Sequence, residues 1–257
     1  MGARVSAPKR EIKAMKMNAL LGVAFGTLLA VRAWAVDEGI DYTELAKPQP
    51  TERGEKIEVL EVFMYSCPHC FYLEPTLEEW LAIKPEKVVF DRMPAIFNAK
   101  VVPHAKAYYA AEQLGKIEQF HLPLFRTLHE NKQAIWDEDA LVAFAEAQGI
   151  DGKAFRNAYN SFSVDMRMQQ ARKMGKAFGI DSVPTVIVNG KYRTSPTQAG
   201  SRKKMVQVID YLIGIEAGQP QGEEEASSTR LDIPQTDVFP TTDDVEQAEA
   251  SGRRQTD

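Results

Sequence analysis

Two cysteines, Cys67 and Cys70, are the residues whose type and spacing could do chemistry. They are the only cysteines in the 257-residue chain, and they stand three apart in the sequence Cys-Pro-His-Cys. A disulfide between them would close a very small loop, so it would add little chain-entropy stabilisation to the fold. A structural crosslink is therefore a poor explanation, and the spacing favours a redox-active dithiol.

Two other uses of a cysteine pair fit the sequence less well. Covalent haem attachment needs a histidine directly after the second cysteine, where this chain has Phe71. A zinc site needs two further ligands, and the chain has no second Cys-X-X-Cys and no closely spaced histidine pair. Zinc would require the dispersed histidines His104, His121 and His129 to converge. We expect neither a metal nor an organic cofactor.

The residues around the dithiol indicate which elements position it. Residues 57–64 form an apolar-rich run of strand length with apolar side chains on both faces, which is typical of a buried strand. After a short turn, apolar residues recur at helical spacing at Phe71, Leu73, Leu77, Trp80 and Leu81. Pro68 fits the first position of this helix, because its missing N–H costs nothing there. Cys67 is then the N-cap, and Cys70 lies on the same face.

A helix N-terminus would change the reactivity of Cys67. Unpaired backbone N–H groups and the positive end of the helix dipole both stabilise a thiolate and lower its pKa. His69 could add a hydrogen bond or a positive charge to that thiolate, or it could be a solvent-exposed loop residue. Cys67 is therefore predicted to be the reactive sulfur, and the deeper Cys70 is predicted to resolve the mixed disulfide. Stabilising the thiolate also makes the disulfide more oxidising.

A second motif lies more than a hundred residues further on. Val183 and Pro184 precede a short β-branched run, 186–188, which ends in Asn189-Gly190, a strong hairpin signal. A proline that opens a strand is compatible with a cis peptide bond, although most bonds before proline are trans. The pattern by itself leaves this isomer open.

The two motifs together resemble the thiol:disulfide interchange proteins of the DsbA type. The resemblance rests on 59–63, on the Cys-Pro-His-Cys sequence and on 179–192, in that order and separation, and it covers roughly residues 40 to 214. It implies an α/β thioredoxin fold with a helical domain inserted between the half that carries the dithiol and the half that carries a cis-proline. It also implies that Pro184 is this cis-proline and that the backbone of Val183 pairs with an extended substrate peptide.

The resemblance also suggests a role for Glu61, an acid in the strand that leads to the dithiol. If Glu61 is buried, its pKa is raised and it can take or relay the proton of Cys70 during exchange. If it points to solvent at a sheet edge, it has no part in the reaction. The apolar surroundings in 59–64 favour burial.

A long helical stretch separates the motifs. Between Phe97 and Phe178, alanine-rich segments are followed by glycines that could end helices, at Gly115, Gly149, Gly175 and Gly179. Asp137 and Asp139 precede an apolar run and fit the N-terminus of one helix. We expect the aromatic and methionine side chains to fill the core, although some could edge a peptide groove: Tyr108, Tyr109, Phe120, Phe125, Phe144, Phe155, Phe162, Met166 and Met174.

The N-terminus predicts export. The basic residues Lys9, Arg10, Lys13 and Lys16 precede the 13-residue apolar run 19–31, which ends near the small-residue site Ala33-Trp34-Ala35. This pattern is typical of a secretory signal peptide cleaved near Ala35, and the run is shorter than the about 20 residues that span a bilayer. A retained anchor is the alternative. Translation could start at Met1, Met15 or Met17.

Charge is distributed unevenly along the chain. The net charge of −5 combines +5 in residues 1–35, −2 in 36–215 and −8 in 216–257. The two longer regions lack the basic excess that nucleic acid requires, so nucleic acid is an unfavourable partner. The predicted organisation is a signal peptide (1–35), an N-terminal segment (36–56), a first thioredoxin part (57–94), a helical insertion (95–178), a second thioredoxin part (179–215) and an acidic disordered tail (216–257).

These observations predict a thiol:disulfide oxidoreductase. The expected protein is a periplasmic monomer that donates its Cys67–Cys70 disulfide to reduced, newly secreted proteins through a mixed disulfide at Cys67. By resemblance, a quinone-linked membrane oxidase of the DsbB type would reoxidise it. The alternatives are a peptide-binding module, or a reductase or isomerase whose dithiol is kept reduced. An isomerase is disfavoured because about 20 residues between Val36 and the first strand leave no room for a dimerisation domain.

Overall fold

The computed structural model of the protein describes residues 36–51 and 53–218. The expected signal peptide, its cleavage site and the possible start codons lie outside the described residues, as does the tail from residue 219 onward. The last helix continues to Glu216, so the first residue assigned to the tail belongs to the folded part of the chain.

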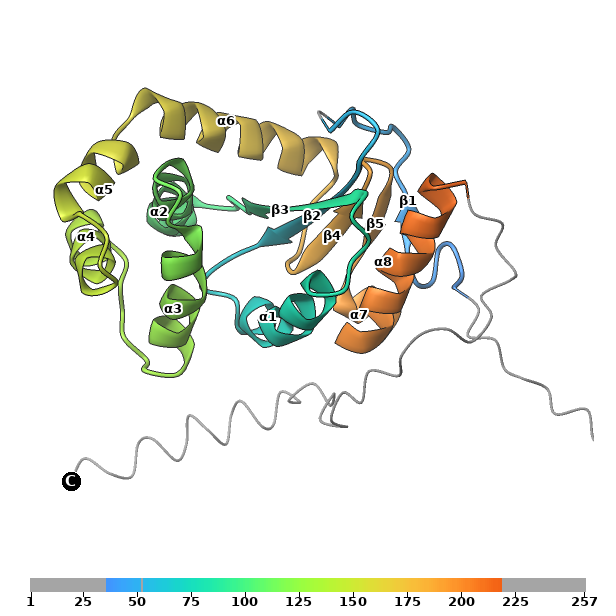
Figure 1. Cartoon of the computed structure of the whole chain (residues 1–257), viewed down its shortest axis with the longest axis horizontal. Helices are drawn as coiled ribbons and strands as arrows, with labels where there is room; N and C mark the ends of the chain where they lie inside the picture. Colours follow the sequence, from blue (N-terminus) through green and yellow to red (C-terminus); the bar gives the residue numbers. More distant parts are fainter. Residues whose placement is uncertain (1–35, 52, 219–257) are drawn as a thin grey trace, which may run out of the picture. The chain divides into compact units, whose positions relative to one another are not determined.

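A five-stranded mixed sheet organises the described residues (Figure 1). The strand order is β1-β5-β4-β2-β3. β2 pairs in parallel with β3 and antiparallel with β4, while β5 pairs antiparallel with both β4 and β1. The strands are β1 (Thr43–Glu44), β2 (Ile57–Phe63), β3 (Val88–Pro94), β4 (Thr185–Val188) and β5 (Tyr192–Thr194).

Helices lie on the sheet and form a separate group between β3 and β4. In Figure 1, α2 to α5 gather beyond one end of the sheet, α6 leads back from them, and α1 and α8 lie against the sheet. The expected α/β architecture with a helical region between its two halves is therefore confirmed. The helices are α1 (Pro68–Leu81), η1 (Ala99–Val101), α2 (Val102–Gln113), α3 (Ile117–His129), α4 (Glu138–Ala147), α5 (Gly152–Tyr159), α6 (Phe162–Ala177), α7 (Pro196–Ala199) and α8 (Arg202–Glu216).

The turn between β4 and β5 forms as its sequence predicts. Asn189 and Gly190 both have positive φ, at 49° and 65°, which is the geometry of the tight hairpin that Asn-Gly favours. A Cβ on residue 190 would lie 2.1 Å from the carbonyl oxygen of Gln49, so glycine is also required by the close approach of the N-terminal segment. This hairpin fixes the strand that follows Pro184.

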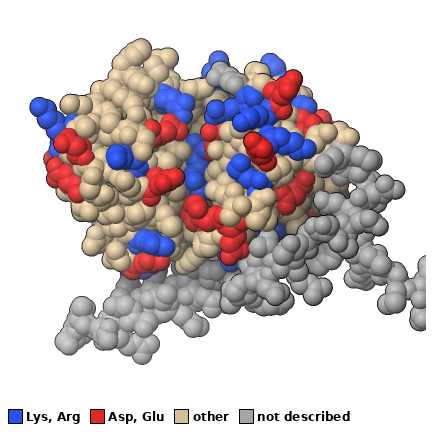
Figure 2. All heavy atoms as spheres, in the orientation of Figure 1, with Lys and Arg blue, Asp and Glu red and all other residues tan. Residues whose placement is uncertain are grey.

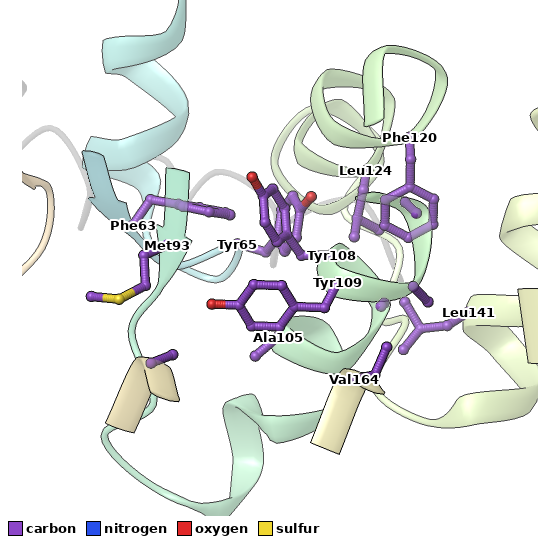
Figure 3. Packing of buried hydrophobic residues seen from close by; sticks show 14 of the residues in the cluster. Phe63, Tyr65, Met93, Ala105, Tyr108, Tyr109, Phe120, Leu124, Leu141 and Val164 are labelled. Carbon is purple, nitrogen blue, oxygen red and sulfur yellow. The ribbon is translucent and has the colours of Figure 1, made fainter. Parts of the chain in front are cut away.

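Two hydrophobic clusters occupy the interior. One is mainly aliphatic and lies among the sheet, α1 and α8, with Val59, Leu77, Val188 and Leu212 among its members. The other joins the end of β2 to the helical region and is rich in aromatic rings. Figure 3 shows Phe63 pointing toward Tyr108, and the two ring centres lie 5.3 Å apart. The dithiol belongs to this second cluster.

The ends of the helices follow the predicted signals with one exception. Gly115, Gly149 and Gly179 have positive φ directly beyond α2, α4 and α6. The side chain of Asp137 caps α4 by accepting a hydrogen bond from the backbone of Ala140 at 2.9 Å. The prediction for Gly175 was wrong, because this residue lies inside α6, where a single glycine is tolerated at a modest cost.

Two of the predicted core residues are on the surface. Phe162 and Met166 are 79% and 46% exposed, whereas the other predicted rings are buried and Met174 is partly buried against the core. They stand four residues apart at the start of α6, so they share a stripe of the helix. The buried stripe of α6 carries Val164, Met168 and Ala171 instead.

The described surface carries both signs of charge. Figure 2 shows acidic and basic side chains interspersed on the face that it presents. Within residues 36–51 and 53–218, no helix is both long enough and apolar enough to cross a membrane.

Candidate active site

Cys67 and Cys70 lie where the sequence places them, at the N-terminus of α1. Cys67 is the N-cap with extended backbone angles, φ −92° and ψ 116°, and Pro68 occupies the first turn. Both cysteines are free thiols in the structure. Cys67 retains 8% exposure, while Cys70 is fully buried, so only the first sulfur is within reach of a substrate.

The two thiols have opposite tendencies to ionise. The Cys70 thiol and the backbone N–H groups of Cys70 and His69 hydrogen bond to the Cys67 sulfur and, against the effect of burial, lower the pKa of Cys67 to about 7. Burial raises the pKa of Cys70 well above its ordinary value, and the charges of Cys67 and Glu61 raise it further. Near neutral pH, Cys67 is therefore more readily ionised than an ordinary thiol, whereas Cys70 keeps its proton.

A loop from the second half of the chain faces the dithiol. The peptide bond between Val183 and Pro184 is cis. The Sγ of Cys67 lies 3.5 Å from the carbonyl oxygen of Val183 and can donate a hydrogen bond to it. A pocket of about 310 Å³ opens beside this contact, and it is lined by His69, Val183, Pro184, Pro196, Thr197 and Gly200.

His69 lies in the first turn of α1 and is exposed. Its backbone N–H is among the groups that lower the pKa of Cys67. Its side chain lines the pocket beside Val183. The predicted contribution of the imidazole to the thiolate stays a prediction.

A cluster of buried charges lies beneath the dithiol. Glu61 on β2 is fully buried, as favoured from its apolar surroundings. The guanidinium of Arg92 on β3 donates to Glu61 and to Glu74 on α1, each at 2.9 Å. Burial raises the pKa values of both carboxyl groups to about 7 in spite of Arg92. The exposed Glu78 lies 3.5 Å from the same guanidinium.

This cluster extends into the helical region through two histidines of α3. His121 contacts Glu74 and the hydroxyl of Tyr65, at 3.1 and 2.9 Å. His129 contacts the carbonyl oxygen of Tyr65 at 2.7 Å and stacks on Phe71, with the rings 12° from parallel. Tyr65 lies two residues before Cys67, and α3 therefore contacts both its side-chain hydroxyl and its backbone carbonyl group.

Sequence reasoning found Glu61 but not the residues that complete its surroundings. Arg92 and Glu74 are 31 and 13 residues away along the chain, and His121 is 60 away. Glu74 carries one local signal, because it lies four residues after Cys70 and so on the same side of the helix. Arg92 and His121 carry no such signal.

The dispersed histidines do not converge on the cysteines. His104 bonds to the carbonyl oxygen of Ile135 at 2.5 Å, while His121 and His129 bond to Glu74 and Tyr65. Among the residues that the structure describes, no group of three or more His, Cys, Asp and Glu side chains could hold a metal ion.

Comparison with known proteins identifies the family. The family described as the DSBA-like thioredoxin domain matches residues 86–203. The thiol:disulfide interchange protein DsbA of Burkholderia cepacia is 39% identical over 194 residues, which span 75% of this chain and 91% of that protein. The protein of the same name from Pseudomonas aeruginosa is 34% identical over 197 residues, which span 77% of this chain and 93% of that protein.

Solved structures agree with this relationship. A crystal structure of Pseudomonas aeruginosa DsbA superposes with a TM-score of 0.70 at 34% identity, covering 72% of this chain and 97% of that one. The oxidoreductase DsbA from Xylella fastidiosa gives a TM-score of 0.65 at 31% identity, covering 69% of this chain and 96% of that one. The chain, with its dithiol at the start of α1 and its thioredoxin fold, belongs to the DsbA family of thiol:disulfide oxidoreductases.

Proposed function

We propose that the protein is a periplasmic dithiol oxidase that donates a Cys67–Cys70 disulfide to reduced, newly secreted proteins. The observation that carries the proposal is the asymmetry of the two thiols. Cys67 is the more accessible and the more acidic sulfur, and Cys70 is buried and holds its proton. Stabilising the thiolate that is released on reduction favours the dithiol form, so the disulfide is readily given away.

The reaction proceeds by two exchange steps. A substrate thiolate attacks the Sγ of Cys67, forms a mixed disulfide there and expels Cys70 as a thiolate, which takes up a proton. A second substrate thiolate then attacks the substrate sulfur of the mixed disulfide and releases Cys67 as a thiolate. Two electrons pass from the substrate dithiol to the protein. The redox-active group is the cysteine pair itself, and no cofactor takes part.

Substrate would bind beside Val183 and Pro184. The Val183 carbonyl lies next to the reactive sulfur, so an extended peptide that pairs with this backbone brings its own cysteine to Cys67. His69 and Pro68 border the approach to the sulfur from α1, and the pocket beyond them would take neighbouring substrate side chains. Glu61 would supply the proton to Cys70 and later remove it.

Localisation and reoxidation complete the proposal. The signal peptide predicted in residues 1–35 would deliver a monomer to the periplasm, where disulfides persist. The names of the relatives support a role in thiol:disulfide interchange. A quinone-linked membrane protein of the DsbB type would restore the disulfide after each cycle.

The in vivo redox state of Cys67 and Cys70 tests this function. Cells that express the full chain are quenched with acid and treated with a thiol-reactive polymer, and the two states are separated by gel mobility. An oxidase is found mostly as the disulfide and becomes reduced when the quinone-linked partner is absent. A dithiol that is found reduced in wild-type cells would make the protein a reductase or isomerase.

Alkylation of the reduced protein across pH distinguishes an enzyme from a peptide-binding module. We expect Cys67 to react with a midpoint near pH 7, and Cys70 to stay protected in the same range. The matched control is Cys70→Ser, which leaves Cys67 as the only thiol. A midpoint for Cys67 at the ordinary value of a free thiol would favour the binding module.

A further inference from the structure

A chain of hydrogen bonds connects Tyr65 to the buried carboxylates. The Tyr65 hydroxyl lies 2.9 Å from Nδ1 of His121, and Nε2 of His121 lies 3.1 Å from Oε1 of Glu74. Both Tyr65 and His121 are almost fully buried. Figure 3 shows the Tyr65 ring among the side chains that connect the end of β2 with the helical region. The chain therefore reaches the oxygen of Glu74 that Arg92 does not contact.

The partners of His121 determine which of its nitrogens carries the proton. Burial lowers the pKa of His121 to about 3, so the imidazole is neutral and has one N–H. Burial also raises the pKa of Tyr65 well above 10, so its hydroxyl is protonated and can donate to Nδ1. With Tyr65 as the donor to Nδ1, we assign the hydrogen of His121 to Nε2, from which it is donated to Glu74.

The two carboxylates differ in the number of donors that they receive. With this assignment, Glu74 accepts from His121 at Oε1 and from Arg92 at Oε2. Glu61 accepts from Arg92 at Oε2, and its Oε1 is buried without a hydrogen-bond partner among the described residues. Donors stabilise the ionised form of a carboxyl group, whereas an unpartnered buried oxygen favours the protonated form.

We propose that Tyr65 and His121 are positioning residues of the exchange reaction: they keep Glu74 ionised and so place the proton that the cluster holds on Glu61. Burial and the shared Arg92 shift the pKa values of both carboxyl groups in the same directions, so the two groups titrate as a pair. The hydrogen bond that only Glu74 receives from His121 decides which member of the pair is protonated. Glu61 is thereby the acid, and Glu74 is the fixed counter-charge of Arg92.

The groups that surround the pair are compatible with this arrangement. Glu61 lies on β2 and faces Arg92, which lies on β3. From α1, the cluster is faced by Glu74, Glu78 and Cys70. The helical region contributes the neutral groups His121 from α3 and Tyr108 from α2, and Tyr65 follows β2. Arg92 is therefore the permanent positive charge that faces both carboxylates.

The consequence for the reaction rests on the proposed function. When substrate attacks Cys67, the departing Cys70 thiolate receives the proton of Glu61, which becomes a carboxylate. When the dithiol is reoxidised, the same carboxylate takes the proton back and Cys70 can attack. Placing the proton on Glu74 would leave Glu61 charged beside the Cys70 thiolate, and the repulsion would oppose its release.

The test measures the protonation of each carboxyl group directly. Carbon NMR of glutamate side chains in the reduced full-length protein is followed from pH 4 to 9, with Glu61 and Glu74 assigned from Glu61→Gln and Glu74→Gln. In the wild type we expect Glu61 to titrate near neutral pH and Glu74 at lower pH. In the double variant Tyr65→Phe/His121→Phe, Oε1 of Glu74 loses its partner and resembles Oε1 of Glu61. The two midpoints should then approach each other by about one pH unit, a tenfold change in proton affinity.

Three further variants keep the test decisive. Tyr65→Phe alone should shift the midpoints in the same direction if the double variant does not fold. His121→Gln, which retains a donor and an acceptor, should keep them near the wild-type values. Tyr108→Phe is the matched control, because it deletes a buried phenol beside the same cluster without touching the chain from Tyr65 to Glu74. Titration of Glu74 rather than Glu61 in the wild type, or unchanged midpoints in the double variant, would overturn the proposal.

A kinetic measurement connects the proton to Cys70. The oxidised protein is mixed with reduced glutathione, whose attack at Cys67 expels Cys70, and the rate is followed from pH 5 to 9. The double variant should lose several-fold in rate where wild-type Glu61 is protonated, with little change above that range. Shifted NMR midpoints with an unchanged pH profile would remove Glu61 and its positioning residues from the reaction. A dithiol that is kept reduced in cells would contradict the oxidase function but leave the NMR outcome as expected.

Discussion

The two sides of α1 lie in very different surroundings. On one side Leu73, Leu77 and Trp80 pack among aliphatic side chains of the sheet and α8, and the Trp80 indole donates to Asp210 at 2.8 Å. On the other side the helix meets aromatic rings, two histidines of α3 and the buried charges around Arg92. The first side is ordinary hydrophobic packing, whereas the second contains groups whose charge changes with pH.

This difference separates two tasks within one helix. Apolar packing stabilises the fold by an amount that depends little on pH, so it can hold the N-terminus of α1 in place under all conditions. Buried ionisable groups cost stability, and their interaction energies depend on protonation. We therefore expect substitutions on the aliphatic side to change stability alone, and substitutions on the charged side to change stability and reactivity together.

The largest expected effect is on activity, at the reactive end of α1. Cys67→Ser should reduce the oxidation of a reduced two-cysteine peptide to the uncatalysed rate, because no sulfur remains to form the mixed disulfide. Its melting temperature should stay within a few degrees of the wild type in the reduced form, since the side chains have nearly the same shape. A large loss of stability would show that this end of the helix also supports the fold.

Arg92→Met should produce the largest loss of stability. It leaves Glu61 and Glu74 buried without their counter-charge, and removing one partner of such a cluster costs about 3–5 kcal/mol. The loss should be greater at pH 8 than at pH 5, because without Arg92 the pKa values of both carboxyl groups rise and both are protonated at pH 5. Chemical denaturation at the two pH values measures it. Arg92→Lys keeps the positive charge but cannot donate to both carboxyl groups in the same geometry. Its stability should lie between those of the wild type and Arg92→Met.

Leu77→Ala tests the aliphatic side. It should destabilise the protein by about 2–5 kcal/mol, because Leu77 is fully buried and alanine leaves a cavity. The loss should be equal at pH 5 and pH 8, and the alkylation midpoint of Cys67 should not move. A pH-dependent loss or a shifted midpoint would show that the two sides of α1 are coupled.

The pH dependence of wild-type stability gives the smallest effect. Glu61 has a pKa of about 7 in the folded protein and 4.5 as its ordinary value, so the folded state retains a proton that the unfolded state releases. This contribution is present in full below about pH 4.5 and is lost as the pH rises through 7. Glu61→Gln should reduce the fall in the free energy of unfolding between acidic and neutral pH by at most about 3 kcal/mol. Equal slopes for the wild type and the variant would contradict the raised pKa.

Local sequence signals were sufficient for the reactive end of α1. Pro68 defines the start of the helix, and with it the N-cap position of Cys67 and the depth of Cys70. The hairpin at Asn189 and Gly190 is similarly local, because its backbone angles follow from two adjacent residues. Motifs of this kind are readable because residues that act together are neighbours in the chain.

The charged side of α1 was largely invisible in the sequence. Arg92 and His121 are brought to Glu74 by the packing of β3 and α3, and no spacing rule predicts such tertiary contacts. The errors on α6 have a related cause. Phe162 and Met166 follow helical spacing, but which stripe of a helix faces the core depends on its neighbours, and the structure buries the stripe with Val164 and Met168.

The edges of the sheet have a consequence for the proposed oxidation of unfolded chains. An exposed strand edge is a template for any extended peptide, so pairing away from Val183 would hold a substrate where it cannot react. The edge of β5 is covered by the two-residue strand β1, and the outer strand β3 carries the charged residues Asp91 and Arg92 and ends in Pro94, which has no N–H to donate (Figure 1). Such edges would disfavour pairing with a substrate peptide at the rim of the sheet. The loop beside Cys67 would then be the favoured binding site for an extended peptide.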